Sequence, residues 1–261
     1  MTDAGVPPRP YVLGESTWPD VGSARFEVAV LPWGATEAHN RHLPYGTDTI
    51  ETESVAIAAA AVAWERGARI LVLPVVPFGV NTGQRGIPFC LNMMPGTQTA
   101  VIRDLLPSLQ EHGIRKLVIL NGHGGNDFKQ IIRELQPSTS LVLAQVNWYQ
   151  VVSTSGFFDE PGDHAGELET SVMLHLRPDL VRPLGTAGPG AARAHRIRAF
   201  REGWAWMPRP WVKVTDDTGV GDPSKSTAAK GSAYFAAVTE KLAAFFCDLA
   251  TADPSDLFDF D

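Results

Sequence analysis

The sequence predicts a layered α/β fold, an α/β/α sandwich in which a mostly parallel central sheet lies between two layers of helices. Short runs rich in Val, Ile and Leu alternate along the chain with longer stretches of helical composition. The apolar character of the short runs is continuous rather than alternating, which is typical of strands covered on both faces of a parallel sheet. This strand–helix alternation implies right-handed crossovers with helices on both faces.

Four strands and five helices follow from this pattern. The strands are expected at 27–32, 69–76, 115–122 and 140–147. The helices are expected at 49–66, 97–112, 126–135, 166–176 and 225–249. Hydrophobic residues make up 44% of the chain and charged residues 20%, close to the globular average. Because no internal repeat and no low-complexity linker interrupts the pattern, we expect a single domain over residues 1–261.

Composition and charge exclude several classes of protein. The formal net charge is −7, whereas a dedicated nucleic-acid binder would carry a basic surface. We expect no membrane span and no signal peptide, because no run approaches about 18 apolar residues and the N-terminus lacks a basic segment followed by an apolar one. The two cysteines, Cys90 and Cys247, form neither a metal-type pair nor a disulfide framework. The simplest prediction is a soluble protein of a reducing cytoplasm.

Two long stretches fall outside the alternation of strands and helices. Residues 77–96 and 178–224 are rich in Gly, Pro and aromatic residues, and loops of this length are commonly functional or disordered. The second stretch contains Trp204, Trp206 and Trp211, which argue against disorder. Buried tryptophans would serve equally in a packed excursion at a subunit interface or in the wall of a substrate pocket. Both interpretations remain open from the sequence.

The densest chemical signal, LPWGATEAHNRHLPYGTDT, follows the first expected strand. It places Glu37, His39, His42 and Asp48 in a loop punctuated by Gly and Pro. Carboxylates and imidazoles are ligands for Zn²⁺, Mn²⁺ and Fe²⁺. In extended backbone Glu37 and His39 would point the same way, and Asp48 is expected to open a helix, where its charge is favourable.

The second and third signals are LVILNGHGGN and GDHAGELETS. In the first, His123 follows an expected strand among glycines, so its imidazole would lie at the strand's carboxyl end, where α/β sheets bind ligands. The string lacks the lysine and the spacing of a nucleotide-binding loop. In the second, Asp163, His164, Glu167 and Glu169 gather where a helix begins. Glu167 and Glu169 would diverge by about 200° on that helix, so both cannot face one site.

Each signal has an ordinary structural interpretation as well. A histidine beside glycine is commonly a hydrogen-bonded structural residue, and acidic residues near helix starts are commonly caps. Three separate clusters that combine His with carboxylate or Gly nevertheless predict a metal site together. Three histidines lie outside the clusters and are expected to be structural: His112, His175 and His195. The role of His42 is left open.

The strings EAHNRHLPYGTD, NGHGGN and HAGELETS, in this order and at these separations, resemble the creatininase (creatinine amidohydrolase) family. The resemblance covers roughly residues 27–175, and it does not by itself assign the segment after residue 178. It implies a creatininase-like fold with two divalent metal ions per chain, Zn²⁺, Mn²⁺ or Fe²⁺. Members of the family assemble as oligomers, commonly hexamers, so the resemblance also implies a homo-oligomer.

The resemblance implies a ligand set at the matching positions. Glu37, Asp48 and His123 would hold one ion, and His39 and Asp48 the second, with Asp48 bridging the pair. In creatininase a Glu two residues after the NGH histidine completes the second site, whereas this chain has Gly125 there. We expect Glu169 to supply the missing ligand, with Glu167 as the reserve. The same departure weakens creatinine as the substrate.

The implied chemistry is hydrolysis by a metal-activated water, whose pKa two cations lower toward about 7. His164 matches a family histidine that shuttles a proton near the substrate, and Asn126 and Asp163 are candidates to orient the ligands by hydrogen bonding. Glu169 is expected to act in catalysis as well as in metal binding.

The substrate stays open. The first choice is a non-peptide C–N bond of a small molecule, including cyclic amides. The alternatives are a peptidase that trims a short modified peptide, a hydrolase that opens a cyclic ketone, and a scaffold that binds without catalysis. The family contains formamide deformylases, a peptidase of the mycofactocin precursor and a hydrolase of a cyclic keto-inositol. We expect a small-molecule substrate and no nucleic-acid or membrane partner.

Overall fold

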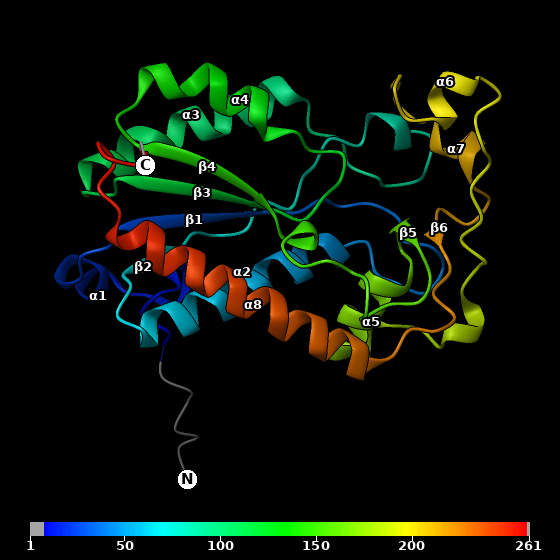
Figure 1. Ribbon diagram of the computed structural model, residues 1–261, viewed down its shortest axis with the longest axis horizontal. Helices are drawn as coiled ribbons and strands as arrows, with labels where there is room; N and C mark the ends of the chain where they lie inside the picture. The colour runs from blue at the N-terminus through cyan, green and yellow to red at the C-terminus, as the bar shows by residue number, and fades with distance from the viewer. Residues whose placement is uncertain (1–7, 260–261) are drawn as a thin grey trace, which may run out of the picture.

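The computed structural model describes residues 8–259. Its centre is a four-stranded parallel sheet in the order β2-β1-β3-β4 (Figure 1). The strands are β1 (Val28–Trp33), β2 (Ile70–Val72), β3 (Lys116–Asn121) and β4 (Val142–Asn147). Val28 is in register with Ile70 on one side and with Lys116 on the other. The predicted parallel α/β sheet is therefore confirmed.

Helices cover both faces of this sheet (Figure 1). One face carries α3 (Pro95–Glu111) and α4 (Phe128–Leu135). The other carries α2 (Thr47–Glu65) and α8 (Ala228–Thr251), and α8 continues beyond the sheet to pack on α5 (Glu167–Leu176). No helix within residues 8–259 combines the length and the apolar character needed to cross a bilayer.

Side chains of β1 alternate between two hydrophobic cores, as the pleat of a strand requires. Val28 and Val30 pack with the apolar faces of α2 and α8. Ala29, Leu31 and Trp33 pack on the opposite side with residues of α3 and α4. Burial of both sets explains the continuous apolar run in the sequence and fixes the strand between two helical layers.

Two expected strands differ from the prediction. The run 69–76 pairs as a strand only over Ile70–Val72, because Pro74 has no amide hydrogen for the ladder; pairing resumes in an isolated bridge between Trp33 and Val76. The run at 140–147 forms β4 as expected, but β4 is an edge strand and most of its residues are only half-buried. The prediction of strands covered on both faces holds for β1, β3 and the short β2.

The segment 178–224 lies beyond the carboxyl ends of the strands (Figure 1). It contains the short helices α6 (Arg198–Arg201) and α7 (Trp211–Val214) and the strand β6 (Val220–Gly221). β6 pairs antiparallel with β5 (Gly162–His164). These elements, and α1 (Trp18–Ser23), have two to six residues and too little periodicity to be predicted from the sequence.

Candidate metal centre

Six acidic and histidine side chains from five parts of the chain meet beyond the carboxyl ends of β1 and β3. Two come from the loop after β1, one from the first turn of α2, one from the loop after β3, one from the end of β5 and one from α5. Five are buried and the last is half-buried: Glu37, His39, Asp48, His123, His164 and Glu169. The carboxyl ends of parallel strands share one edge of the sheet, which is why clusters distant in sequence converge here.

Two groups of possible metal donors share Asp48. In the first, Nδ1 of His123 lies 3.0 Å from Oε1 of Glu37 and 3.1 Å from Oδ2 of Asp48. In the second, Nε2 of His39 lies 2.8 Å from Oδ1 of Asp48, and Glu169 offers an oxygen within 4.8 Å of both. Each carboxylate oxygen of Asp48 therefore faces a different donor group.

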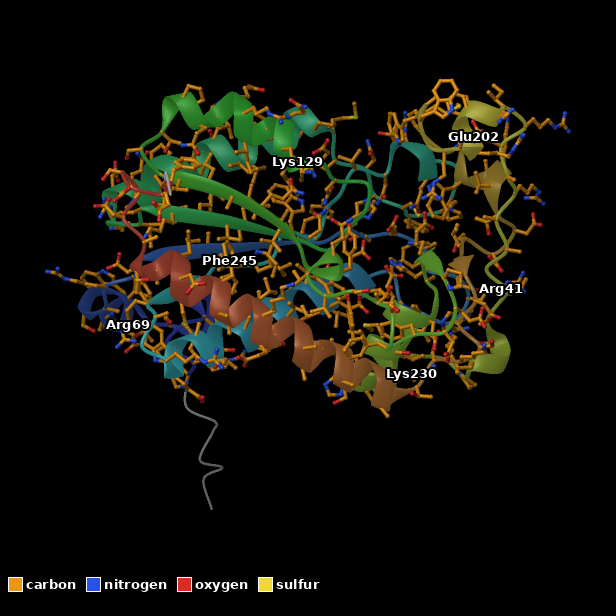
Figure 2. The ribbon with its side chains drawn as sticks, in the orientation of Figure 1. Arg41, Arg69, Lys129, Glu202, Lys230 and Phe245 are labelled. Carbon is orange, nitrogen blue, oxygen red and sulfur yellow. The ribbon has the colours of Figure 1, made fainter. Side chains whose placement is uncertain are left out.

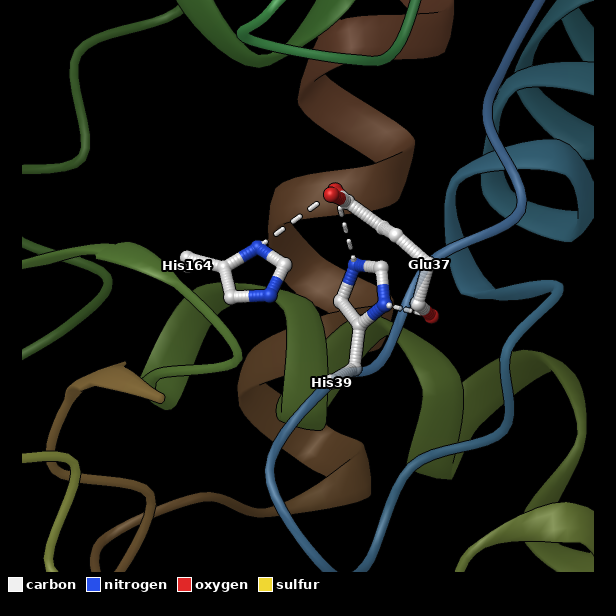
Figure 3. Close-up of side chains that lie close together, drawn as sticks. All are labelled: Glu37, His39 and His164. Atoms are coloured by element: carbon white, nitrogen blue, oxygen red, sulfur yellow. Dashed lines mark hydrogen bonds and ion pairs between the residues drawn. The ribbon is translucent and has the colours of Figure 1, made fainter. Parts of the chain in front are cut away.

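A third group combines Glu37, His39 and His164 (Figure 3). Oε1 of Glu37 lies 3.6 Å from Nδ1 of His164 and 3.9 Å from Nε2 of His39. The two imidazole rings lie side by side, with their centroids 4.2 Å apart. His164 is thus brought into the same centre as the predicted ligands.

His39, His123 and His164 each hydrogen-bond a backbone carbonyl through one ring nitrogen and direct the other nitrogen to the centre. The carbonyl contacts are His39 Nδ1 to Glu37 (3.0 Å), His123 Nε2 to Val80 (3.1 Å) and His164 Nε2 to Ala38 (2.8 Å). A neutral imidazole that donates to a carbonyl presents a lone pair on its other nitrogen. Here those lone pairs face carboxylate oxygens, so either a proton or a metal ion must lie between each nitrogen and the oxygen that it faces. The donor set fits a divalent metal ion.

The pKa shifts of His39 and Asp48 also show that the centre favours positive charge beside its carboxylates. Burial of His39 acts to lower its pKa, but the Asp48, Glu169 and Glu37 carboxylates outweigh burial and raise this pKa to about 10. For Asp48, burial acts to raise the pKa, but His39 and His123 hold it below its usual range. Asp48 thus remains charged at neutral pH, and a metal ion has to displace protons from the imidazoles to bind.

Gly125 lies where no side chain fits. A Cβ atom there would lie 2.3 Å from the Val80 carbonyl oxygen and 2.4 Å from Nε2 of His123, the two atoms that contact each other across the loop. The Val80 amide in turn donates to Oδ1 of Asn126, 3.0 Å away. Asn126 therefore fixes the Val80 peptide whose carbonyl orients His123.

Asp163, Glu167 and His42 lie outside the three donor groups. Asp163 forms a 2.9 Å ion pair with Arg209. Glu167 is buried, pairs with Lys230 near the start of α8 and accepts hydrogen bonds from the Asp159 and Glu160 amides. Lys230 is labelled in Figure 2.

His42 is buried against Thr170, with 2.8 Å between Nε2 and Oγ1. Burial, followed by repulsion from His39, lowers the pKa of His42 to about 4. It is therefore a neutral hydrogen-bonding residue.

The tryptophans of segment 178–224 were expected to be buried, and the structure confirms this for one of the three. Trp211 is buried, and its ring packs edge-on against His164 with centroids 4.8 Å apart. The Arg209 guanidinium lies over the Trp211 ring, 4.8 Å from the ring centroid. Trp204 and Trp206 are instead 74% and 83% exposed. One tryptophan thus borders the centre and two lie on the surface.

Three buried residues around the centre were not predicted from the sequence: Gln84, Cys90 and Glu51. Gln84 and Cys90 from loop 77–96 are buried, and Gln84 donates its amide to Glu37. The length of the loop was the sole signal in the sequence. Glu51, one turn after Asp48 on α2, is buried as well; burial and then the nearby Glu169 and Asp48 raise its pKa well above the ordinary value.

The fold and the buried set of carboxylates and imidazoles define an α/β protein with a candidate centre for divalent metal ions. The family model for creatininase, described as creatinine amidohydrolase, matches residues 14–246. The chain belongs to the creatininase family.

Named relatives of the chain include both peptide-processing and amide-hydrolysing enzymes. The mycofactocin precursor peptide peptidase of Mycobacterium tuberculosis is 31% identical, over 87% of each chain. The creatinine amidohydrolase of Pseudomonas putida is 31% identical, over 65% of this chain and 73% of its own. A provisionally named creatinine amidohydrolase from Bacteroides fragilis has a crystal structure with a TM-score of 0.89 and 45% identity, covering 95% of this chain and 98% of that one.

Proposed function

We propose that this chain is a metal-dependent hydrolase that cleaves an amide C–N bond at a centre of two divalent ions. Glu37, Asp48 and His123 would hold one ion, and His39, Asp48 and Glu169 the other. The observation that carries the proposal is the sharing of Asp48, since its Oδ2 lies 3.1 Å from His123 and its Oδ1 lies 2.8 Å from His39. A bridging carboxylate between two donor groups is what a binuclear site requires.

Glu169 is our proposal for the ligand that Gly125 cannot provide. It lies in the first turn of α5, and its Oε2 accepts a 2.5 Å hydrogen bond from the Ala165 amide. That bond holds the carboxylate against the centre, within 4.8 Å of the donor atoms of His39 and Asp48. The contacts of Glu167 with Lys230 leave it facing away, which supports Glu169 over Glu167.

The mixed nitrogen and oxygen donors suit Zn²⁺, Mn²⁺ or Fe²⁺. One solved creatininase of this fold, at 22% identity, is described as a Zn–Zn type, and another, at 21%, as a Mn form. When bound, two such ions supply a water that loses its proton near neutral pH and an electrophile that polarises a carbonyl.

The chain's own residues would manage the protons of the reaction. His164 holds its Nε2 on the Ala38 carbonyl at 2.8 Å, which leaves Nδ1 directed to the centre. From there Nδ1 can carry a proton to the amide nitrogen, which then leaves as a neutral amine. The ring of Trp211 covers the side of His164 and keeps bulk water from it.

A small amide, including a cyclic one, is the first substrate class. A short peptide is the second, because the relatives that match 87% of the chain are peptidases and because the segment that carries Trp211 also exposes the aromatic rings of Trp204 and Trp206. Both classes need the same attack on an amide carbonyl, and they differ in the room around it.

Elemental analysis of protein purified without chelator tests the proposal. We expect about two metals per chain in the wild type, about one in Glu169→Ala, and loss of both metal and turnover in His123→Ala. His175→Ala, which removes an exposed histidine packed on Phe235, should keep both metals. Absence of stoichiometric metal from the wild type would overturn the proposal. Cyclic amides, formamides and short peptides are then compared as substrates.

A further inference from the structure

Gln84 of loop 77–96 places its buried side-chain amide against the carboxylate of Glu37. Gln84 is 3% exposed, and its Nε2 donates to Oε2 of Glu37. Its Oε1 accepts a hydrogen bond from the Cys90 thiol at 3.3 Å. The Cys90 sulfur accepts from the Ala38 amide at 3.2 Å. A continuous chain of hydrogen bonds therefore runs from the backbone beside Glu37, through the loop, and back to the Glu37 side chain.

The direction of this chain is fixed by its chemistry. Burial raises the pKa of the Cys90 thiol, so the sulfur keeps its proton and can donate it to an acceptor. Oε1 of Gln84 is the acceptor that the thiol finds, which turns the NH₂ group toward Glu37. A carboxylate can only accept from that NH₂ group, so each member of the chain meets a partner of the right kind.

The loop holds Gln84 in this position at several points. The Leu91 amide donates to the Thr36 carbonyl at 3.0 Å, and the Asn81 side chain donates to the Leu91 carbonyl at 3.0 Å. On its outer side, Gly83 lies so close to the Arg209 carbonyl that no side chain fits between them. These contacts fix the backbone of the loop on both sides of Gln84.

Oε2 of Glu37 is thus occupied, and Oε1 alone faces the imidazoles. Oε1 lies 3.0 Å from His123, 3.6 Å from His164 and 3.9 Å from His39. We infer that Gln84 is a positioning residue that limits Glu37 to one metal-facing oxygen, and that Cys90 sets the orientation of its amide. This inference rests on the proposed metal centre. One oxygen from Glu37, rather than two, leaves a coordination position for water or substrate.

Titration of the apo-protein with Co²⁺ alone tests the inference through affinity and visible absorption, which reports coordination geometry. Gln84→Met keeps the volume and removes the amide, and we expect Co²⁺ affinity to fall about 10–100-fold. We also expect a changed Co²⁺ spectrum, because Oε2 becomes free to bind. Gln136→Met is the matched control, since Gln136 bonds only to the backbone near the start of β4. It should leave affinity and spectrum unchanged.

Variants of Cys90 test the orientation of the amide without changing Gln84. Cys90→Ser keeps a group that donates and accepts, and should retain the wild-type spectrum. Cys90→Val keeps the bulk and loses both functions, so its spectrum should shift toward that of Gln84→Met. Wild-type affinity and spectrum in both Gln84→Met and Cys90→Val would overturn the inference while leaving the metal centre intact. Failure of the wild type to bind Co²⁺ would instead overturn the proposed function.

Discussion

Replacing Gly125 by alanine should damage the centre although glycine itself contributes no ligand. The new Cβ would lie 2.3 Å from the Val80 carbonyl oxygen and 2.4 Å from Nε2 of His123, closer than real Cβ contacts. Neither neighbour can move alone, because the two are joined by a 3.1 Å hydrogen bond and the Val80 amide is held by Asn126. The substitution must therefore separate His123 from Val80.

The cost of Gly125→Ala has two parts. Overpacking of a well-filled site costs about 1–3 kcal/mol. Loss of the hydrogen bond that orients His123 adds about 0.5–1.5 kcal/mol. At about 2–4 °C per kcal/mol for a chain of this size, Tm of the apo-protein should fall by roughly 3–18 °C. Because His123 loses its orienting carbonyl, metal affinity should fall as well, by about 10–100-fold.

Differential scanning calorimetry of apo-protein and a Co²⁺ titration measure the two effects. Gly124→Ala is the matched control one residue away, because a Cβ there would meet only the Tyr149 hydroxyl, at an ordinary 4.0 Å. We expect Gly124→Ala to bind Co²⁺ like the wild type. A Gly125→Ala protein with wild-type Tm and wild-type Co²⁺ affinity would refute the reasoning, because residues 77–80 would then be able to shift without cost.

Three further predictions concern the pH dependence of stability, the pH dependence of metal binding and the packing of α8. Asp217 accepts hydrogen bonds from the Gly190 and Gly219 amides, and these bonds outweigh burial and lower the pKa of its carboxyl group. The contribution of Asp217 to stability is therefore present above about pH 4 and is lost as the pH falls through the lowered pKa. Asp217→Asn should cost about 1–3 kcal/mol of unfolding free energy at pH 7, and less at pH 2, in calorimetry. Because the pKa of His39 is about 10 in the apo-protein, metal binding should release protons and strengthen up to tenfold per pH unit between pH 6 and 8, measured by chelator competition. Tyr234→Phe, which removes a hydroxyl that bonds two backbone carbonyls after β4, should lower the free energy of unfolding by about 1 kcal/mol in urea denaturation with metal affinity unchanged.

The sequence predicted the parts of the centre that follow from strand topology. Glu37, His39 and His123 follow strands that proved to be neighbours, β1 and β3, so their convergence needs only the rule that parallel strands share a carboxyl edge. Asp48 was expected to open a helix and lies in the first turn of α2. The predicted helices also agree with the structure to within three residues at each end, since long periodic segments carry most of the signal.

The parts that the sequence did not predict depend on the paths of irregular segments. Gln84 and Cys90 reach Glu37 because loop 77–96 folds back over it, and no periodicity in that loop indicates the path. Asp163 and Glu167 were candidates near the centre, yet their partners Arg209 and Lys230 come from chain more than 40 residues later. Such long-range ion pairs cannot be assigned from spacing in the sequence.

Loop 77–96 connects the missing ligand at position 125 to the ligand set that remains. Its Val80 carbonyl orients His123 and fills the space in which a side chain on Gly125 would lie. A few residues later, Gln84 engages one oxygen of Glu37. A carboxylate at position 125 and this course of the loop therefore exclude each other. In the proposed centre the second-site ligand must therefore come from another element, and α5 offers Glu169, which lies within 4.8 Å of the donor atoms of His39 and Asp48.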